Sequence, residues 1–248
     1  MTTPTTPDET LPSPLHADLI QMLRAAHAAE HDIFGALSPD RREAPNTIGE
    51  WSAKDVLAHL AAWRSVEARQ LERRIRGESG SDPGDPGPEV PVDEANEMLR
   101  AKFAAWSWDD VVREADASVE ALVAAIGRSG TTALSQREGI VVGIGTSGSN
   151  HAMGHLVDAA RLAGARPHFD ALARAFEEIV TRRHLAPRDS GVILYNLACY
   201  QALAGETDDA RRLLRTALAH RRDLLTDAKT DPDLVSIRDD LESLASSS

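Results

Sequence analysis

The 248-residue sequence contains a single cysteine and no long apolar run. Cys199 has no partner for an internal disulfide, and its place within an apolar helical pattern predicts a buried structural thiol. No segment approaches the roughly 18 consecutive apolar residues of a membrane-spanning helix. The start, MTTPTTPDETLPSP, lacks the basic end and the apolar stretch of a signal peptide. We therefore expect residues 1–13 to be a disordered tail and the protein to be cytoplasmic.

Basic residues are also scarce. The sequence has 27 Lys and Arg against 39 Asp and Glu, which gives a formal net charge of −12. Affinity for a nucleic-acid backbone comes mainly from Lys and Arg that displace counterions. We therefore expect no nucleic-acid partner, and for the same reason no binding to an anionic membrane surface.

Several familiar signatures of catalysis are missing. The sequence contains no nucleophile elbow, no pair of catalytic carboxylates and no CxxC zinc pattern. The stretch GIGTSG, residues 143–148, satisfies the glycine fingerprint of dinucleotide-binding folds, but no second strand pattern follows near Asp170. We interpret these glycines as a flexible entry to a helix that begins at Ser149 or Asn150. If the protein is an enzyme, we expect its chemistry to use histidines.

Apolar residues recur at the helical period along most of the chain, which predicts an all-α protein. Ser52 with Asp55 and Ser107 with Asp110 form capping-box patterns at the starts of two helices. The stretch GESGSDPGDPGPEVPVD predicts a long crossover, because Gly, Pro and Asp are dense in it. Long helices are expected over residues 15–37, 53–77, 107–127 and 149–164, with a short helix over 93–103 after the crossover. Four amphipathic helices with one long crossover describe a four-helix bundle, a fold that builds metal sites between facing helices.

The last third of the sequence has a different pattern. In GVILYNLACYQALAGETDDARRLLRTALAHRRDLL, large and small residues fall where a tetratricopeptide repeat places them, and AGETDDA resembles the turn of its helical hairpin. One hairpin cannot bury both of its faces alone. We expect it to pack on the helix HFDALARAFEEIVTRR, on the closing segment TDPDLVSIRDDLESL, on the bundle or on a second subunit. The sequence thus predicts a bundle domain over 14–167, a tetratricopeptide-like domain over 168–248, and a homodimer.

Histidines supply the strongest candidate site. His151 and His155, in SNHAMGHLVDAARLAG, lie one turn apart on an otherwise apolar helix and could both bind one ion at about 2.0–2.1 Å. His59 adds a third imidazole on the apolar side of the second long helix. Separate histidines on apolar faces are usually hydrogen-bonded core residues, so the pattern alone leaves both interpretations open. His27 and His31 have the same spacing at the edge of the first apolar stripe, and we interpret them as boundary residues.

Two carboxylates are candidates for supporting this site. Glu30 falls near the centre of the first helix's apolar stripe, where a carboxylate needs a partner. That partner could be a metal-bound histidine, a bound water or an arginine. Asp55 lies one turn before His59 and could accept a hydrogen bond from its imidazole, or could only cap the helix.

The strings WSAKDVLAHLAAW and HAMGH resemble the signature of the DinB-like superfamily, especially its ClbS/DfsB and maleylpyruvate-isomerase N-terminal-domain branches. The resemblance covers roughly residues 14–166. It implies a four-helix bundle that holds a divalent metal, zinc or nickel, through His59, His151 and His155. Asn96, in DEANEML, matches an Asn that the ClbS-like branch carries after the crossover, and is a third candidate catalytic residue. Relatives commonly carry a glutamate where this chain has Gly154.

The resemblance implies two chemistries. Some relatives transfer a low-molecular-weight thiol such as mycothiol to electrophiles, and the ClbS-like branch hydrolyses a reactive natural product as self-protection. Three protein ligands leave a coordination position open, which is typical of a catalytic metal. We therefore expect a metal-dependent detoxification enzyme that acts on a small electrophile by thiol transfer or hydrolysis. The alternative is a non-catalytic protein, whose bundle sequesters a drug or whose C-terminal helices bind a protein partner.

Overall fold

The computed structural model describes residues 13–48, 50–78, 80–87, 89–130, 134 and 139–246. The expected tail therefore lies, except for Ser13, outside the described residues. Within the described ranges the regular structure is helical and contains no β-strand, which confirms the all-α prediction. In the same ranges, no helix combines the length and apolar character that crossing a membrane requires.

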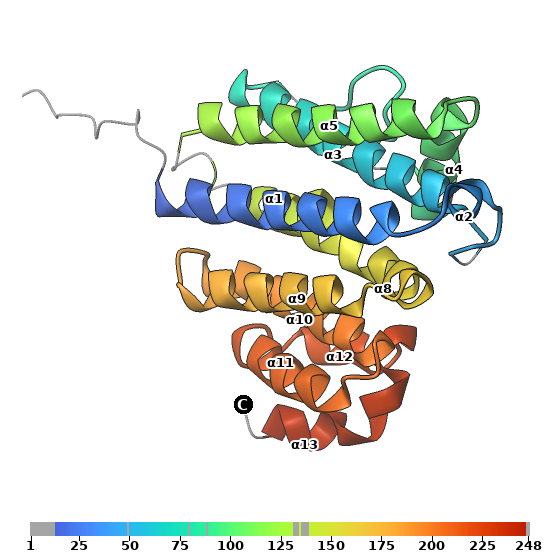
Figure 1. The fold of residues 1–248 in the computed structure, drawn as a ribbon. Coiled ribbons are helices and arrows are strands. Elements are labelled where there is room, and N and C mark those ends of the chain that lie inside the picture. The colour runs from blue at the N-terminus through green and yellow to red at the C-terminus, as the bar shows by residue number, and fades with distance from the viewer. Residues whose placement is uncertain are drawn as a thin grey trace, which may run out of the picture.

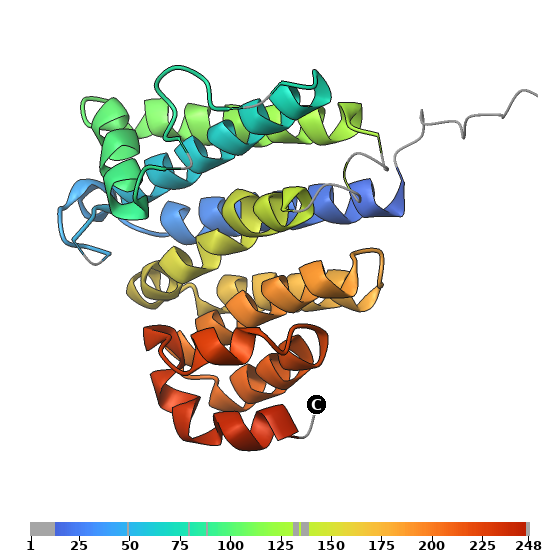
Figure 2. The same ribbon diagram turned by 180° about the vertical axis from the view of Figure 1, so that it is seen from behind.

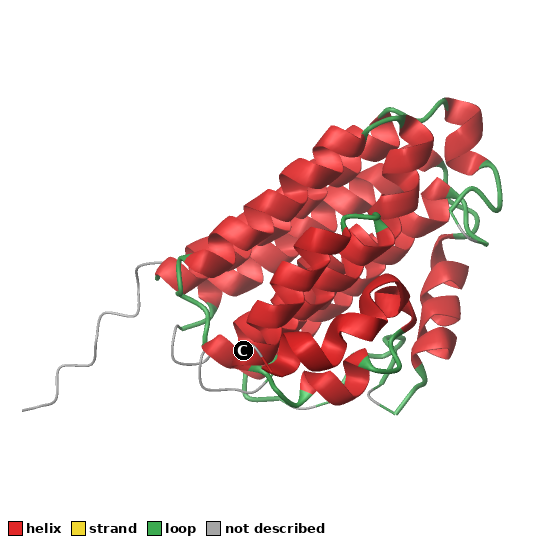
Figure 3. Ribbon diagram, turned by 90° about the horizontal axis from the view of Figure 1, so that it is seen from below, coloured by secondary structure: helices red, strands yellow, loops and turns green. Residues whose placement is uncertain are grey.

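The helices stack in layers (Figure 1). One layer contains α3 and α5, the next contains α1 and α8, and below these lie α9 and α10, followed by α11 and α13. The axes of the long helices are roughly parallel to one another when the molecule is seen from below (Figure 3). Their bounds are α1 Pro14–Gly35, α2 Pro39–Glu43, α3 Ala53–Ile75, α4 Val92–Phe103, α5 Trp108–Arg128, α7 Ile140–Gly145, η1 Thr146–Asn150, α8 His151–Ala163, α9 Arg166–Thr181, α10 Pro187–Leu203, α11 Thr207–His220, α12 Leu224–Ala228, η2 Pro232–Asp240 and α13 Leu241–Ser246.

The helix starts at α3 and α5 follow the predicted capping boxes. The Ser52 hydroxyl accepts a hydrogen bond from the Asp55 backbone N–H at 3.0 Å, and Ser107 and Asp110 make the same reciprocal arrangement. Each box satisfies backbone donors that the first turn would otherwise leave unpaired. These caps fix where α3 and α5 begin. The two helices then pack closely against each other, and α5 also packs against α1.

The prediction that residues 143–148 form a flexible entry to a helix beginning at Ser149 or Asn150 was wrong. The chain is already helical from Ile140, and residues 146–150 form a π-helical turn that leads directly into α8. A Cβ on Gly145 would lie 2.8 Å from Ile193 Cδ1 of α10, and one on Gly148 would lie 3.0 Å from Leu122 Cδ2 of α5. The glycines therefore allow neighbouring helices to approach closely, and they do not form a flexible entry. Figure 2 shows this segment in the layer of α1.

The C-terminal helices join the same core. α10 packs against α11 on one side and against α7, η1 and α8 on the other, while η2 and α13 cover α11. The buried apolar residues form one cluster that extends from Leu15 to Leu244. Because the hairpin's apolar faces are covered within one chain, they no longer provide a reason for dimerisation. The homodimer and the domain boundary at 167 stay predictions.

Cys199 is buried in α10, as the sequence predicted, with 4% of its surface exposed. Burial and the nearby Asp231 raise the pKa of its thiol. Asp231 accepts a hydrogen bond from the Tyr195 hydroxyl at 2.7 Å and from the Cys199 thiol at 3.6 Å. These bonds fasten the start of η2 to α10, which supports a structural role for the cysteine.

Candidate metal centre

Three histidines from two helices converge in the interior. α3 supplies His59, and α8 supplies His151 and His155; one ring nitrogen of each lies within 4.8 Å of the other two. The Nε2 atoms of His151 and His155 are 3.1 Å apart. Two ligands of a tetrahedral zinc ion are about 3.3 Å apart, given bonds of about 2.0–2.1 Å. The spacing of the His151 and His155 nitrogens therefore fits one ion, and His59 is close enough to belong to the same group.

The π-helical turn positions the pair on α8. His151 is the first residue of α8, directly after η1. The Ser149 hydroxyl donates to the carbonyls of Ile144 at 3.1 Å and Gly145 at 2.9 Å, and Asn150 Nδ2 donates to the Ile193 carbonyl at 3.2 Å. Single π-turns inside α-helices occur frequently at functional sites. Here the turn and its side-chain bonds hold the start of α8 against α10.

Burial keeps the three imidazoles neutral. Burial lowers the pKa of His59 to about 2, that of His151 to about 3 and that of His155 to about 4, and the neighbouring imidazoles add to the effect on His59 and His151. A histidine must be neutral to bind a metal. The Nδ1 atom of His59 is buried and has no hydrogen-bond partner, which is unusual for a core histidine. Both observations favour ligands over separate core residues.

Two tryptophans enclose the histidines. The Trp51 ring stacks on His155 with an interplanar angle of 9° and meets His59 edge-on at 4.9 Å between ring centroids. Trp63 lies on the other side of His59, at 6.4 Å. The sequence interpretation did not include either tryptophan in the site. The signal was present, because they begin and end the motif WSAKDVLAHLAAW that carries His59.

Asn96 reaches the site from α4. Its Oδ1 accepts a hydrogen bond from Trp63 Nε1 at 3.1 Å. Asn96 also lines an open groove with His155 and Trp51; the other lining residues are Ile48, Glu50, Gly154 and Asp158. The groove has a volume of about 380 Å³, so a small molecule can reach His155 through it. Of the three candidate catalytic residues, Asn96 is the one on this groove.

Asp55 has a different role from the one proposed for catalysis. Its carboxylate accepts hydrogen bonds from the Ser52 backbone N–H at 3.1 Å and from the Ser52 hydroxyl at 2.7 Å. These bonds complete the capping box of α3. Of the two roles considered for Asp55, an acceptor for the His59 imidazole or a helix cap, the structure shows the helix cap.

Glu30 is paired with an arginine, one of the three partners considered from the sequence, although the sequence did not identify which arginine. Its carboxylate binds Arg64 of α3, and the exposed fractions of the two side chains are 0% and 1%. Arg64 Nε also donates to the Gly148 carbonyl in the π-turn at 3.0 Å. Burial by itself would raise the pKa of Glu30, but the neighbouring Arg64 guanidinium lowers it. Arg64 could have been found from its spacing on the helix, because it follows Leu60 by four residues and therefore lies on the apolar side of α3.

The Glu30–Arg64 pair is close enough to act on the histidines by charge. Arg64 lowers the pKa of His151, and Glu30 raises the pKa of both His151 and His155. Glu30 is thus a neighbour of the site through its charge, whereas its carboxylate is bonded to the guanidinium.

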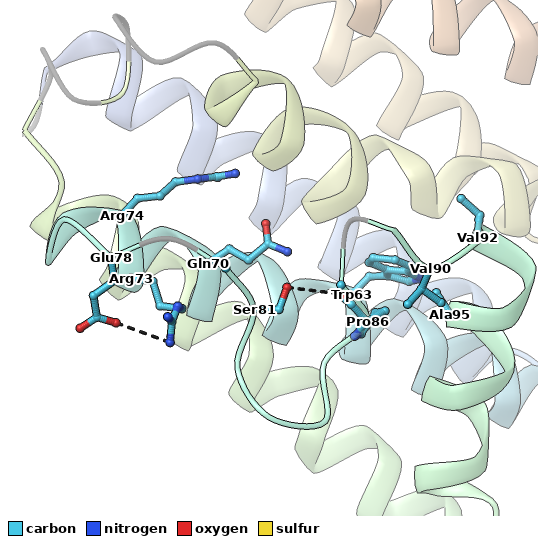
Figure 4. A pocket seen from close by; sticks show the side chains of 12 residues that line it. Trp63, Gln70, Arg73, Arg74, Glu78, Ser81, Pro86, Val90, Val92 and Ala95 are labelled. Atoms are coloured by element: carbon cyan, nitrogen blue, oxygen red, sulfur yellow. Dashed lines mark hydrogen bonds and ion pairs between the residues drawn. The ribbon is translucent and has the colours of Figure 1, made fainter.

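Trp63 also lines a larger cleft (Figure 4). It has a volume of about 570 Å³ and lies between α3 and the crossover. Trp63, Pro86, Val90 and Ala95 gather at its apolar end. The other end is polar and carries Gln70, Arg73, Arg74 and Glu78. Arg73 and Glu78 form an ion pair there, with 3.5 Å between Nη1 and Oε2. The cleft therefore suits an amphipathic molecule whose apolar part lies nearest the histidines.

Gly154 has a packing reason to differ from the resembled family. A Cβ at this position would lie 3.0 Å from Cε1 of the Tyr200 ring in α10. A longer side chain, such as the glutamate common in the relatives, would meet the same ring. The C-terminal helices therefore occupy the space next to His155 that a glutamate would need.

No match was found when the chain was compared with protein-family models, with curated proteins and with solved structures. The DinB-like resemblance therefore depends on the two histidine motifs and on the site they form.

The buried histidines predict that the metal-free protein loses stability in acid. The pKa of His155 is about 4 in the folded chain, below the ordinary value of 6.5. As the pH falls through this window, the unfolded chain binds a proton that the folded chain does not, so the free energy of unfolding decreases. The decrease is about 1.4 kcal/mol per pH unit for one such group.

Urea unfolding of chelator-treated protein at several pH values between 4 and 6.5 measures this slope. The variant His155→Gln should have a shallower slope by about 1.4 kcal/mol per pH unit. The matched variant His220→Gln, at an exposed position on α11, should keep the wild-type slope. Identical slopes in all three proteins would contradict a buried, neutral His155.

Proposed function

We propose that the protein is a DinB-like, metal-dependent enzyme that detoxifies a small electrophile by thiol transfer or hydrolysis. The observation that carries the proposal is the convergence of His59, His151 and His155, all neutral at pH 7, beside an open groove. The proposal includes a four-helix bundle of α1, α3, α5 and the α7–η1–α8 segment. It also includes a tetratricopeptide-like hairpin of α10 and α11.

The three imidazoles would hold a divalent ion, zinc or nickel. When bound, such an ion supplies an acidified water or a thiol such as mycothiol in its thiolate form. Trp51 packs against His155 and His59, which would hold the two imidazole rings in place. Arg64 and Glu30 are buried as an ion pair whose opposite charges cancel, so they place no net charge beside the site.

Asn96 and Trp63 would orient the substrate. Asn96 Oδ1 is already bonded to Trp63, which leaves its Nδ2 group as a hydrogen-bond donor for a carbonyl in the groove. The cleft beyond Trp63 adds an apolar wall and a charged end. We therefore expect the electrophile to be amphipathic, with its reactive atom next to His155 and its polar end toward Arg73.

Turnover of model electrophiles tests the proposal. Zinc- and nickel-loaded protein is incubated with an aryl halide or an epoxide, and consumption is followed with mycothiol, with glutathione and without thiol. We expect metal-dependent consumption that falls at least about 100-fold in His151→Ala, because one missing ligand removes more than the 10–100-fold typical of its supporting partners. His220→Ala should keep the wild-type rate. Equal rates in the wild type, His151→Ala and metal-free protein would overturn the enzymatic proposal.

One observation favours the non-catalytic alternative. A groove of about 500 Å³ lies along α9, α10 and α11, away from the histidines. Val180, Leu194 and Leu213 contribute its apolar part, and Arg183 and Ser190 its polar part. If the protein acts as a binding module, Thr216→Glu, at an exposed position of this groove, should weaken ligand binding without changing the metal content. Binding that instead depends on His151 would contradict this alternative.

A further inference from the structure

A second group of ligand-type side chains lies between α1 and α5. His27 and His31 are one turn apart on α1, and their rings meet edge-to-face at 4.5 Å between centroids. Asp116 of α5 faces both of them. His27 Nε2 is 2.9 Å and His31 Nε2 2.8 Å from the same carboxylate oxygen, Oδ1. Two helices thus bring two imidazoles and a carboxylate to one point.

The hydrogen bonding of this group is incomplete. His27 Nδ1 and Glu30 Oε2 are both buried and both lack a hydrogen-bond partner, although they lie 3.7 Å apart. A neutral His27 that donates its Nε2 proton to Asp116 has no proton on Nδ1. Its lone pair then faces a carboxylate oxygen, which is unfavourable for two buried acceptors.

A cation on Nε2 removes this conflict. When Nε2 binds a metal ion through its lone pair, the neutral ring carries its proton on Nδ1. That proton can then be donated to Glu30 Oε2, giving the carboxylate–histidine–metal arrangement in which an outer carboxylate fixes the tautomer. The same change also converts Asp116 from a hydrogen-bond acceptor into a ligand.

We infer that His27, His31 and Asp116 form a second divalent-cation site, with Glu30 as the outer acceptor for His27. Two imidazoles and one carboxylate are ligands typical of zinc and related transition metals, whereas calcium and magnesium prefer an all-oxygen set. The exposed fractions are 18% for His27, 46% for His31 and 51% for Asp116. The ion can therefore enter from solvent, and water can complete its coordination. This inference does not depend on the proposed enzyme function.

Cobalt or zinc titration of the full chain, after complete removal of metal by a chelator, tests the inference. We expect two ions per chain in the wild type and one in His31→Gln or Asp116→Asn. Both substitutions are at exposed side chains, so the fold should be retained. His151→Ala should also bind one ion, and the double variant His31→Gln/His151→Ala should bind none. A nitrogen NMR spectrum should show the His27 proton move from Nε2 to Nδ1 when the wild type binds zinc.

His168→Gln is a matched control. His168 is an exposed histidine, 2.9 Å from the Asp32 carboxylate, but it has no second imidazole beside it. This variant should keep both ions. If His31→Gln and the wild type bind equal amounts of metal, the inference is overturned and the group is a hydrogen-bonded cluster without an ion. Failure of the proposed function gives a different result. If only the second site binds metal, the wild type and His151→Ala each bind one ion, and His31→Gln binds none.

Discussion

Replacement of His59, His151 or His155 by alanine is expected to remove one tightly bound divalent ion per chain, while the helical content remains that of the wild type. The three ring nitrogens lie within 4.8 Å of one another, so each contributes to the same ion. The apolar cluster that includes all layers of helices carries most of the folding free energy, so the helices should survive. Metal analysis after purification without a metal-chelating tag, together with circular dichroism, measures both quantities.

The combination of these variants separates a shared ion from three separate histidines. If the residues act through one ion, the double and triple variants lose no more metal than each single variant. If they are separate core residues, each costs about 1–3 kcal/mol of stability and the costs add. His220→Ala, on α11, is the control and should retain the ion. A metal-free wild type, or additive stability losses without any change in metal, would contradict the site.

The parts of this structure that depend on local pattern could be predicted from the sequence. The helix starts at Ser52 and Ser107 follow from residues three positions apart. The pairing of His151 with His155 follows from the helical period alone. The addition of His59 needed more, because it requires two helices to face each other, and there the motif resemblance supplied the argument. The group of three histidines could therefore be predicted, although the neighbouring tryptophans were not assigned to it.

Other features depend on contacts between distant segments, and local pattern does not encode them. The glycines of residues 143–148 look like a loop or a nucleotide fingerprint until Ile193 and Leu122 are seen against them. Gly154 looks like a departure from a family motif until Tyr200 is placed beside it. For the same reason, the sequence left the partner of Glu30 open between a histidine, a water and an arginine. The outcome depended on how α1 and α3 face each other.

The Arg64→Met variant is expected to lose about 3–5 kcal/mol of stability, the typical cost of removing one partner of a buried ion pair. The substitution leaves the Glu30 carboxylate, whose exposed fraction is 0%, without its cation. It also removes the donor to the Gly148 carbonyl in the π-turn. Urea unfolding followed by circular dichroism measures the loss. A change of this size should lower the urea midpoint by more than 1 M, because small proteins have slopes of about 1–3 kcal/mol per M.

The double variant Glu30→Leu/Arg64→Met tests whether the cost comes from the unpaired charge. Apolar side chains of similar size can replace a buried pair at little cost, so the double variant should be more stable than Arg64→Met alone. Arg161→Met provides the surface control. Arg161 binds Asp158 one turn away on α8, with 77% of its side chain exposed, and its loss should cost less than about 1 kcal/mol. If Arg64→Met and Arg161→Met cost the same, or if the double variant is the least stable of the three, Glu30 and Arg64 are not a buried, mutually dependent pair. In that case the hydrogen bond from Arg64 to Gly148 would not be what holds the π-turn before His151 in place.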